Sequence, residues 1–231
     1  MKEKVNEKNI KAVVFDIAGT TINEGDIVYQ SVRNALQLFG FDFPLQKVIM
    51  EVGGMSKKEG ITKLIMENYP DRHSKKLLDK IFHCFIEGLE ERYLGDPSIT
   101  EMEGATDLFQ WLKSKDIMVA LNTGYSRSTA DILMERMQWK KHMLIDTIIT
   151  SDEVEKGRPE PNMINEIANE FQLLPASMAK VGDTLVDIQE GHNAGCSVIV
   201  GITSSKYDKE ALLNIGATHA IDQLAELKEL I

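Results

Sequence analysis

Short apolar runs alternate with longer amphipathic segments along most of this chain. The apolar runs are a few residues long and rich in β-branched side chains, as in buried strands, whereas the segments between them have helical periodicity. Strands that alternate with helices are joined by right-handed crossovers, so the pattern predicts an α/β fold with a doubly wound, Rossmann-like, mostly parallel sheet. The expected strands are residues 12–15, 117–122, 147–150, 180–182, 196–200 and 217–221, and the expected helices are 105–115, 126–138, 161–171, 185–194, 209–215 and 223–230.

A helical region interrupts this alternation after the first strand. We expect it to form an all-helical cap domain at 23–99, inserted into an α/β core domain made of 1–22 and 100–231. Open α/β sheets bind ligands outside the carboxyl ends of their strands. The insertion leaves the sheet at that edge, and we therefore expect it to act as a lid. Its helical patterns cover residues 28–39, 45–51, 57–68 and 75–93.

Composition narrows the choice of partners. A net charge of -10 argues against nucleic acid or an anionic membrane surface, although local basic groups or a metal can still bind a small anion. Residues 1–8 are charged, and no run approaches the roughly 18 apolar residues that span a bilayer. We expect a cytoplasmic protein. Cys84 and Cys196 are the two cysteines and lie far apart, so neither a disulfide framework nor a zinc site is predicted.

An aspartate stands at the end of the first apolar run. Asp16 is followed by Ile17-Ala18-Gly19-Thr20, a turn with a glycine and a hydroxyl. A carboxylate at the exit of a buried strand is placed to act as a nucleophile in phosphoryl chemistry. Ala18 occupies the position where a second acid would assist a leaving group.

Two further strand exits carry candidate phosphate ligands. Thr123, Gly124 and Tyr125 precede a predicted helix, whose N-terminus attracts a phosphate, but an ordinary helix cap explains the same residues. Arg158 stands between a glycine and a proline, as a rigid fork suited to phosphate oxygens. The alternative is a solvated loop arginine.

The last strand exit carries two carboxylates four residues apart. Asp183 and Asp187 follow an apolar strand, and hard oxygen ligands of this kind suit Mg²⁺. Asp183 alone is also explained as a helix N-cap, a position that aspartate favours.

These four motifs, in this order, resemble those of the haloacid dehalogenase superfamily of hydrolases and phosphotransferases. The resemblance implies that Asp16 forms an aspartyl-phosphate that water later hydrolyses. It also implies that Asp183, Asp16 and the carbonyl oxygen of Ala18 hold Mg²⁺, while Asp187 and Thr184 support the ligands from outside the coordination sphere.

The same resemblance assigns the substrate contacts. Thr123, Gly124 and Tyr125 would bind the phosphate group, and Arg158 would neutralise it during transfer. The implied partner is a small phosphorylated or phosphonate substrate, and the implied assembly is a monomer or a homodimer.

The missing second acid decides which substrates are feasible. General acid–base catalysis is worth 10²–10⁴-fold, so without it roughly 3–5 kcal/mol of barrier must be removed in another way. Simple alkyl phosphate esters should be poor substrates. A bond whose leaving group needs no proton remains feasible.

Asp16-x-Ala18-Gly19-Thr20, Thr123-Gly124-Tyr125 and the arginine motif resemble phosphonoacetaldehyde hydrolase, or phosphonatase. In that family a cap lysine forms a Schiff base with the aldehyde, and Lys57 stands at the matching position. Ser56-x-x-Glu59 predicts a capping box that places Lys57 in a first helical turn, where the helix dipole favours the neutral amine. The alternative is a solvated surface lysine.

Three neighbouring positions depart from the phosphonatase pattern. Gly53 replaces a methionine, Gly60 replaces a histidine, and Asp26 stands where the family has a small thiol residue. These changes favour a related 2-oxo-phosphonate over phosphonoacetaldehyde itself.

Three other activities compete with C–P cleavage. A phosphatase acting on a small phosphate monoester, of the phosphoglycolate or sugar-phosphate type, needs Lys57 only as a substrate contact. A haloacid dehalogenase also lacks the second acid but needs no metal, and the pair Asp183 and Asp187 favours keeping one. A non-catalytic phosphate-binding protein is the third alternative, and the retained Asp16 and Arg158 argue against it.

Overall fold

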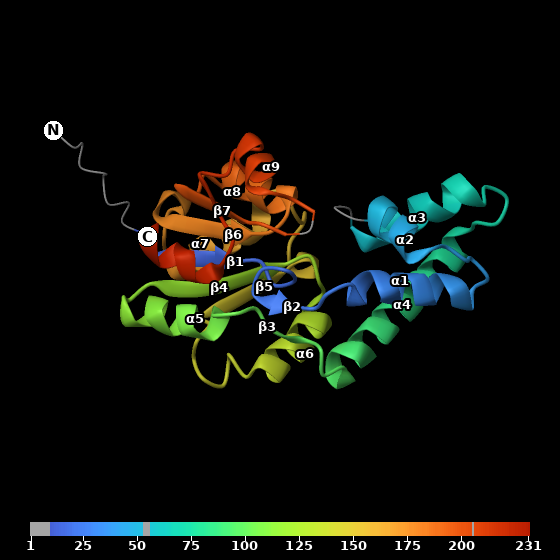
Figure 1. The fold of residues 1–231 in the computed structure, drawn as a ribbon, viewed down its shortest axis with the longest axis horizontal. Helices are drawn as coiled ribbons and strands as arrows, with labels where there is room; N and C mark the ends of the chain where they lie inside the picture. The colour runs from blue at the N-terminus through green and yellow to red at the C-terminus, as the bar shows by residue number, and fades with distance from the viewer. Residues whose placement is uncertain (1–9, 53–55, 205) are drawn as a thin grey trace. The chain divides into compact units, whose positions relative to one another are not determined.

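The computed structural model describes residues 10–52, 56–204 and 206–231. The chain divides into two compact units. One unit combines Met1–Asn23 with Thr100–Ile231, and the other is Glu24–Ile99. Figure 1 shows the sheet of the first unit and the helices of the second.

A six-stranded sheet forms the centre of the first unit. Its order is β5-β4-β1-β6-β7-β8, and each neighbouring pair is parallel, which confirms the predicted doubly wound α/β fold. From β1 the chain continues to β4 and β5 on one side and then returns to β6 on the other. The strand order therefore reverses at β1, where such folds bind ligands. The strands are β1 (Ala12–Phe15), β4 (Met118–Thr123), β5 (Thr147–Thr150), β6 (Met178–Gly182), β7 (Val198–Ile202) and β8 (His219–Ile221).

Helices cover both faces of this sheet (Figure 1). Val14 of β1 is buried in one cluster with Ile167 of α7, Ile188 of α8 and other apolar residues. On the opposite face the ring of Phe15 packs edge-on against Phe109 of α5, with centroids 5.2 Å apart. β1 is thus buried on both sides, as its uninterrupted apolar sequence requires. The helices are α5 (Ala105–Ser114), α6 (Arg127–Met137), α7 (Asn162–Phe171), α8 (Leu185–Ala194) and α9 (Lys209–Asn214).

The structure corrects several predicted elements. The helix expected at 223–230 is a 3-10 helix, η3 (Leu224–Glu229). The strand expected at 196–200 is shifted by two residues, because α8 ends on Gly195 in the left-handed conformation and a short connection follows. An antiparallel ribbon of β2 (Ile22–Asn23) and β3 (Thr100–Glu101) was not predicted, since two-residue strands carry no periodicity. Two further 3-10 turns are η1 (Ser151–Glu153) and η2 (Pro175–Ser177).

The second unit is helical. Leu36, Val48, Leu64 and Leu89, one from each helix, are among its fully buried residues. Throughout residues 10–52, 56–204 and 206–231, no helix is both long and apolar enough to cross a bilayer. The helices are α1 (Ile27–Leu38), α2 (Leu45–Val52), α3 (Lys57–Asn68) and α4 (Lys75–Gly95).

Candidate active site

Asp16 lies at the carboxyl edge of the central strand. The register pairs Phe15 with Leu121 of β4 and with Val181 of β6, so Asp16 stands in line with the polar end of β4 and the end of β6. Its backbone N–H donates to the carbonyl oxygen of Val181 at 2.9 Å. The side chain is buried, because the strand before it runs through the middle of the sheet.

The turn after Asp16 lies directly against Asp183. Gly19 has a φ of +81°, and a Cβ at this position would lie 2.7 Å from Oδ2 of Asp183. Glycine is therefore required both by the left-handed backbone and by the close approach. Thr20 donates its hydroxyl to Oδ1 of Asp183 at 3.1 Å. Ala18 is joined to Ile22 by an isolated bridge within this turn.

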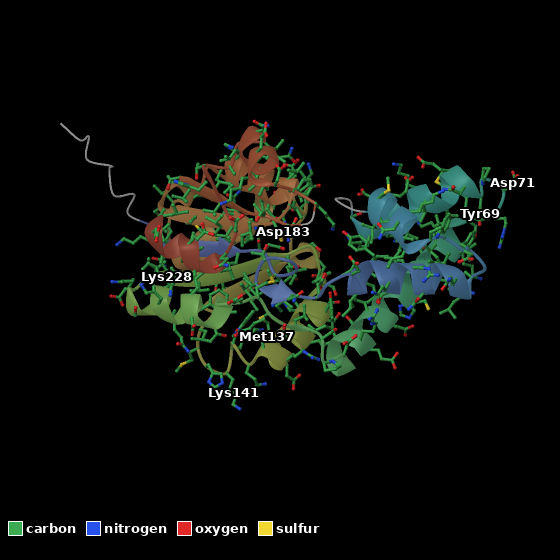
Figure 2. All side chains as sticks on the ribbon, viewed as in Figure 1. Tyr69, Asp71, Met137, Lys141, Asp183 and Lys228 are labelled. Atoms are coloured by element: carbon green, nitrogen blue, oxygen red, sulfur yellow. The ribbon has the colours of Figure 1, made fainter. Side chains whose placement is uncertain are left out.

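Three carboxylates meet at this edge. One oxygen from each of Asp16, Asp183 and Asp187 lies within 4.8 Å of the others, and Asp183 is labelled in Figure 2. The N-cap of α8 is Thr184, whose N–H donates to Oδ2 of Asp187 at 3.2 Å, so the interpretation of Asp183 as the N-cap is wrong. A cluster of hard oxygen ligands fits a divalent cation such as Mg²⁺.

Arg158 joins two of these carboxylates. Its Nη2 donates to Oδ1 of Asp16 at 2.6 Å, and its Nη1 donates to Oδ1 of Asp187. The side chain is 10% exposed, so the interpretation as a solvated loop arginine is wrong. The loop is tied to α8 by Asn193, whose Nδ2 donates to the carbonyl oxygen of Pro159 at 2.8 Å.

The three carboxyls have different pKa values because their surroundings differ in charge. Burial, together with repulsion from Asp16 and Asp187, raises the pKa of Asp183 to about 8. Burial also raises the pKa of Asp16, against the attraction of Arg158. Burial alone would raise the pKa of Asp187, but Arg158 and Lys180 outweigh it and lower the pKa to about 2. A bound cation would relieve the repulsion between these close carboxylates.

The predicted phosphate-binding segment ends the neighbouring strand. Thr123 is the last residue of β4 and is buried, and its Oγ1 accepts from the N–H of Tyr125 at 3.2 Å. The cap of α6 is Ser126, whose side chain accepts from the N–H of Thr129. Helix capping is therefore carried out by Ser126, and it does not account for Thr123. Gly124 receives a hydrogen bond on its carbonyl oxygen from Ser151 at 2.9 Å.

Lys57 belongs to the helical unit. It is the first residue of α3, and Ser56 caps that helix by accepting from the N–H of Glu59, which is one of the two hydrogen bonds of the predicted capping box. The Nζ of Lys57 lies 5.4 Å from the centroid of the Tyr29 ring. A Cβ on Gly60 would lie 2.7 Å from Cγ1 of Val52, so α2 and α3 pack too closely here for the histidine of the phosphonatase pattern. The departure at Gly53 lies outside the described residues.

Three buried polar residues beside Arg158 were missed from the sequence. Lys180 in the middle of β6, Asn122 in β4 and Glu190 in α8 have no exposed surface. The available signal was a lysine inside a strand that otherwise reads as buried, since a charged residue is almost never fully buried without a partner.

The sequence comparisons name the class of protein to which this fold and carboxylate cluster belong. The family model described as haloacid dehalogenase-like hydrolase matches residues 13–201, and the chain belongs to this family. The family and the hydrolase class predicted from the four motifs are thus confirmed.

Particular relatives include enzymes of two activities. The chain is 28% identical over 228 residues to a phosphonoacetaldehyde hydrolase of Latilactobacillus sakei, covering 93% of this chain and 82% of the relative. It is 23% identical over 225 residues to a phosphorylated carbohydrates phosphatase of Thermotoga maritima, covering 96% and 100%. A predicted phosphoglycolate phosphatase from Haemophilus somnus shares the fold, with a TM-score of 0.83, 17% identity and coverage of 96% and 98%.

Proposed function

We propose that this protein is a Mg²⁺-dependent hydrolase of the phosphonatase type, which cleaves the C–P bond of a small 2-oxo-phosphonate. The observation that carries the proposal is the cluster of Asp16, Asp183 and Asp187, with Arg158 bonded to the carboxylate that would attack phosphorus. The similarity to a phosphonoacetaldehyde hydrolase supports the choice of substrate class.

Asp16 and Asp183, with the carbonyl oxygen of Ala18, would hold the cation, and Asp187 and Thr184 would support them. The cation would supply electrostatic stabilisation of the transferring phosphoryl group. Two of the carboxyls have a raised pKa, which is the behaviour of ligands that lack their counter-ion. The donor set therefore fits the metal.

The protein residues would act in a fixed order. The neutral amine of Lys57 condenses with the substrate carbonyl to an imine and releases water. The Asp16 carboxylate attacks phosphorus, and the C–P electron pair moves into the imine to give an enamine. Water then hydrolyses the aspartyl-phosphate, and protonation of the enamine followed by hydrolysis of the imine returns the carbonyl product and Lys57.

Arg158 would bind the phosphoryl oxygens during transfer, and Thr123, Gly124 and Tyr125 would complete the phosphate contacts. Because the enamine is a leaving group that needs no proton, Ala18 in place of a second acid is no obstacle. In an enzyme that hydrolyses phosphate esters, alanine in place of this acid would raise the activation barrier by roughly 3–5 kcal/mol.

The experiment is borohydride trapping during turnover of phosphonoacetaldehyde and longer 2-oxo-phosphonates with Mg²⁺. We expect inorganic phosphate release and a reduced adduct on Lys57, located by peptide mass spectrometry. The alternative is a phosphatase acting on small phosphate monoesters, favoured by the similarity to a phosphorylated carbohydrates phosphatase. Turnover of phosphoglycolate or sugar phosphates without any lysine adduct would establish that alternative.

A further inference from the structure

A second charged cluster lies directly behind the candidate active site. Lys180 projects from the middle of β6 and has no exposed surface. Its Nζ lies 2.6 Å from Oδ1 of Asn122, 3.0 Å from Oδ1 of Asp187 and 3.2 Å from Oε2 of Glu190. An ammonium group has three N–H donors, so all of its hydrogen-bonding capacity faces these three partners.

The partners are connected to one another as well. The Nδ2 of Asn122 donates to both carboxylate oxygens of Glu190, at 2.9 and 2.8 Å. Glu190 Oε2 also lies 4.0 Å from Nε of Arg158. Asp187 Oδ1 is shared between Lys180 and Nη1 of Arg158. Asp187 and Glu190 therefore each form ion pairs with both cations, Lys180 and Arg158.

Stability alone does not account for this cluster. Burying an ion pair costs desolvation that its attraction often only balances, and apolar residues of similar volume can fill such a site equally well. A strand at the centre of a sheet accommodates an apolar side chain without difficulty. Apolar residues in place of Lys180 and Glu190 could not reproduce one feature. Lys180 contacts Asp187, and both Asp187 and Glu190 in turn contact Arg158.

We propose that Lys180, held by Asn122 and Glu190, is a positioning residue that fixes Asp187 and the guanidinium of Arg158 for phosphate binding, a role that rests on the function proposed above. Without Lys180, the cation that stays beside Glu190 among the described residues is Arg158. The guanidinium is then drawn toward Glu190 and away from Asp16 and the phosphate site. Asp187 loses one of the two cations on its Oδ1 at the same time.

The test measures binding of inorganic phosphate in the presence of Mg²⁺ by isothermal titration, together with thermal unfolding. Lys180→Met removes the ammonium but keeps the length of the side chain. We expect phosphate affinity to fall by about 10–100-fold, as is typical when a group that orients a ligand is lost. Lys209→Met is the control, because Lys209 makes an exposed pair with Asp222 at 2.7 Å, and it should leave phosphate binding unchanged.

The double variant Lys180→Met/Glu190→Gln separates positioning from simple charge balance. Removing both charges relieves the unpaired carboxylate, so the unfolding temperature should recover from that of Lys180→Met. Phosphate affinity should stay at least about tenfold below that of the original protein. The charged Glu190 no longer draws Arg158 away, but Asp187 still lacks the ammonium that holds it and, through it, the guanidinium of Arg158.

Three results would overturn the proposal. One is a folded Lys180→Met protein with unchanged phosphate affinity, and another is a double variant whose affinity returns in full. The third is that neither variant folds, which would make Lys180 a structural charge. A starting protein that binds no phosphate with Mg²⁺ would instead refute the proposed function itself, so the two failures are distinguishable.

Discussion

Replacing Gly19 with alanine adds one methyl group at the point where the turn after β1 touches Asp183. The new Cβ would lie 2.7 Å from Oδ2 and 3.0 Å from Cγ of that side chain. Contacts under 3 Å cannot persist, so either the turn or the Asp183 carboxylate must move. Both belong to the proposed metal site.

The effect on stability follows from the backbone. An alanine held at a φ of +81° costs about 1–3 kcal/mol. For a domain of this size each kcal/mol lowers the unfolding temperature by about 2–4 °C, so the expected loss is about 2–12 °C. Gly104 is the matched control, because its φ is +79° but a Cβ there meets nothing within 4 Å. Gly104→Ala should lose a similar amount of stability from the same strain.

Metal binding should separate the two variants. We expect Mg²⁺ affinity, measured by isothermal titration, to fall by about 10–100-fold in Gly19→Ala and to stay unchanged in Gly104→Ala. Equal Mg²⁺ affinity in both variants would refute the reasoning, since it would mean that Asp183 is not a ligand of the cation.

Three other predictions test the remaining parts of the site. Asp16→Asn should abolish phosphate release while the circular dichroism spectrum is kept, and retained turnover would remove the covalent mechanism. Lys57→Ala should reduce turnover of an oxo-phosphonate far more than Lys58→Ala, because Lys58 forms an exposed pair with Asp79 at 2.9 Å; equal losses would contradict the imine. The metal-free Asp183 carboxyl, with its pKa raised to about 8, is largely protonated at pH 7 and must lose that proton to bind Mg²⁺. Mg²⁺ affinity should therefore increase from pH 6 to about 8, with proton release in titrations run in two buffers, and a pH-independent affinity would argue against it.

The sheet could be predicted from the sequence because its strands are short apolar runs. The main site residues could be predicted because they stand where those runs end. Asp16, Thr123 and Asp183 follow or close apolar strands, and parallel strands bring their carboxyl ends to one edge. The four helices of the second unit were predicted because apolar residues recur in each with helical spacing, as with Val48 and Val52 of α2 and Ile61 and Ile65 of α3.

The buried charge cluster could not be predicted, because it depends on tertiary distances. Lys180, Asn122 and Glu190 lie on three different elements. The register of β4, β1 and β6 brings Asn122 near Lys180, and the packing of α8 against β6 adds Glu190. The sequence likewise could not decide whether Arg158 is exposed or buried, because a loop position between glycine and proline suits either kind of side chain. The two carboxylates that accept its hydrogen bonds, Asp16 and Asp187, are 142 and 29 residues away.

The central claim is that the carboxylate of Asp16 captures phosphorus, and rapid quenching tests it most directly. The protein with Mg²⁺ would be mixed with a slight excess of a 2-oxo-phosphonate substrate, stopped in acid within one turnover, and mapped by peptide mass spectrometry. We predict one added phosphoryl group on the peptide that contains Asp16, lost on longer incubation. Phosphorus attached to any other residue, or complete turnover by the Asp16→Asn variant, would contradict the account.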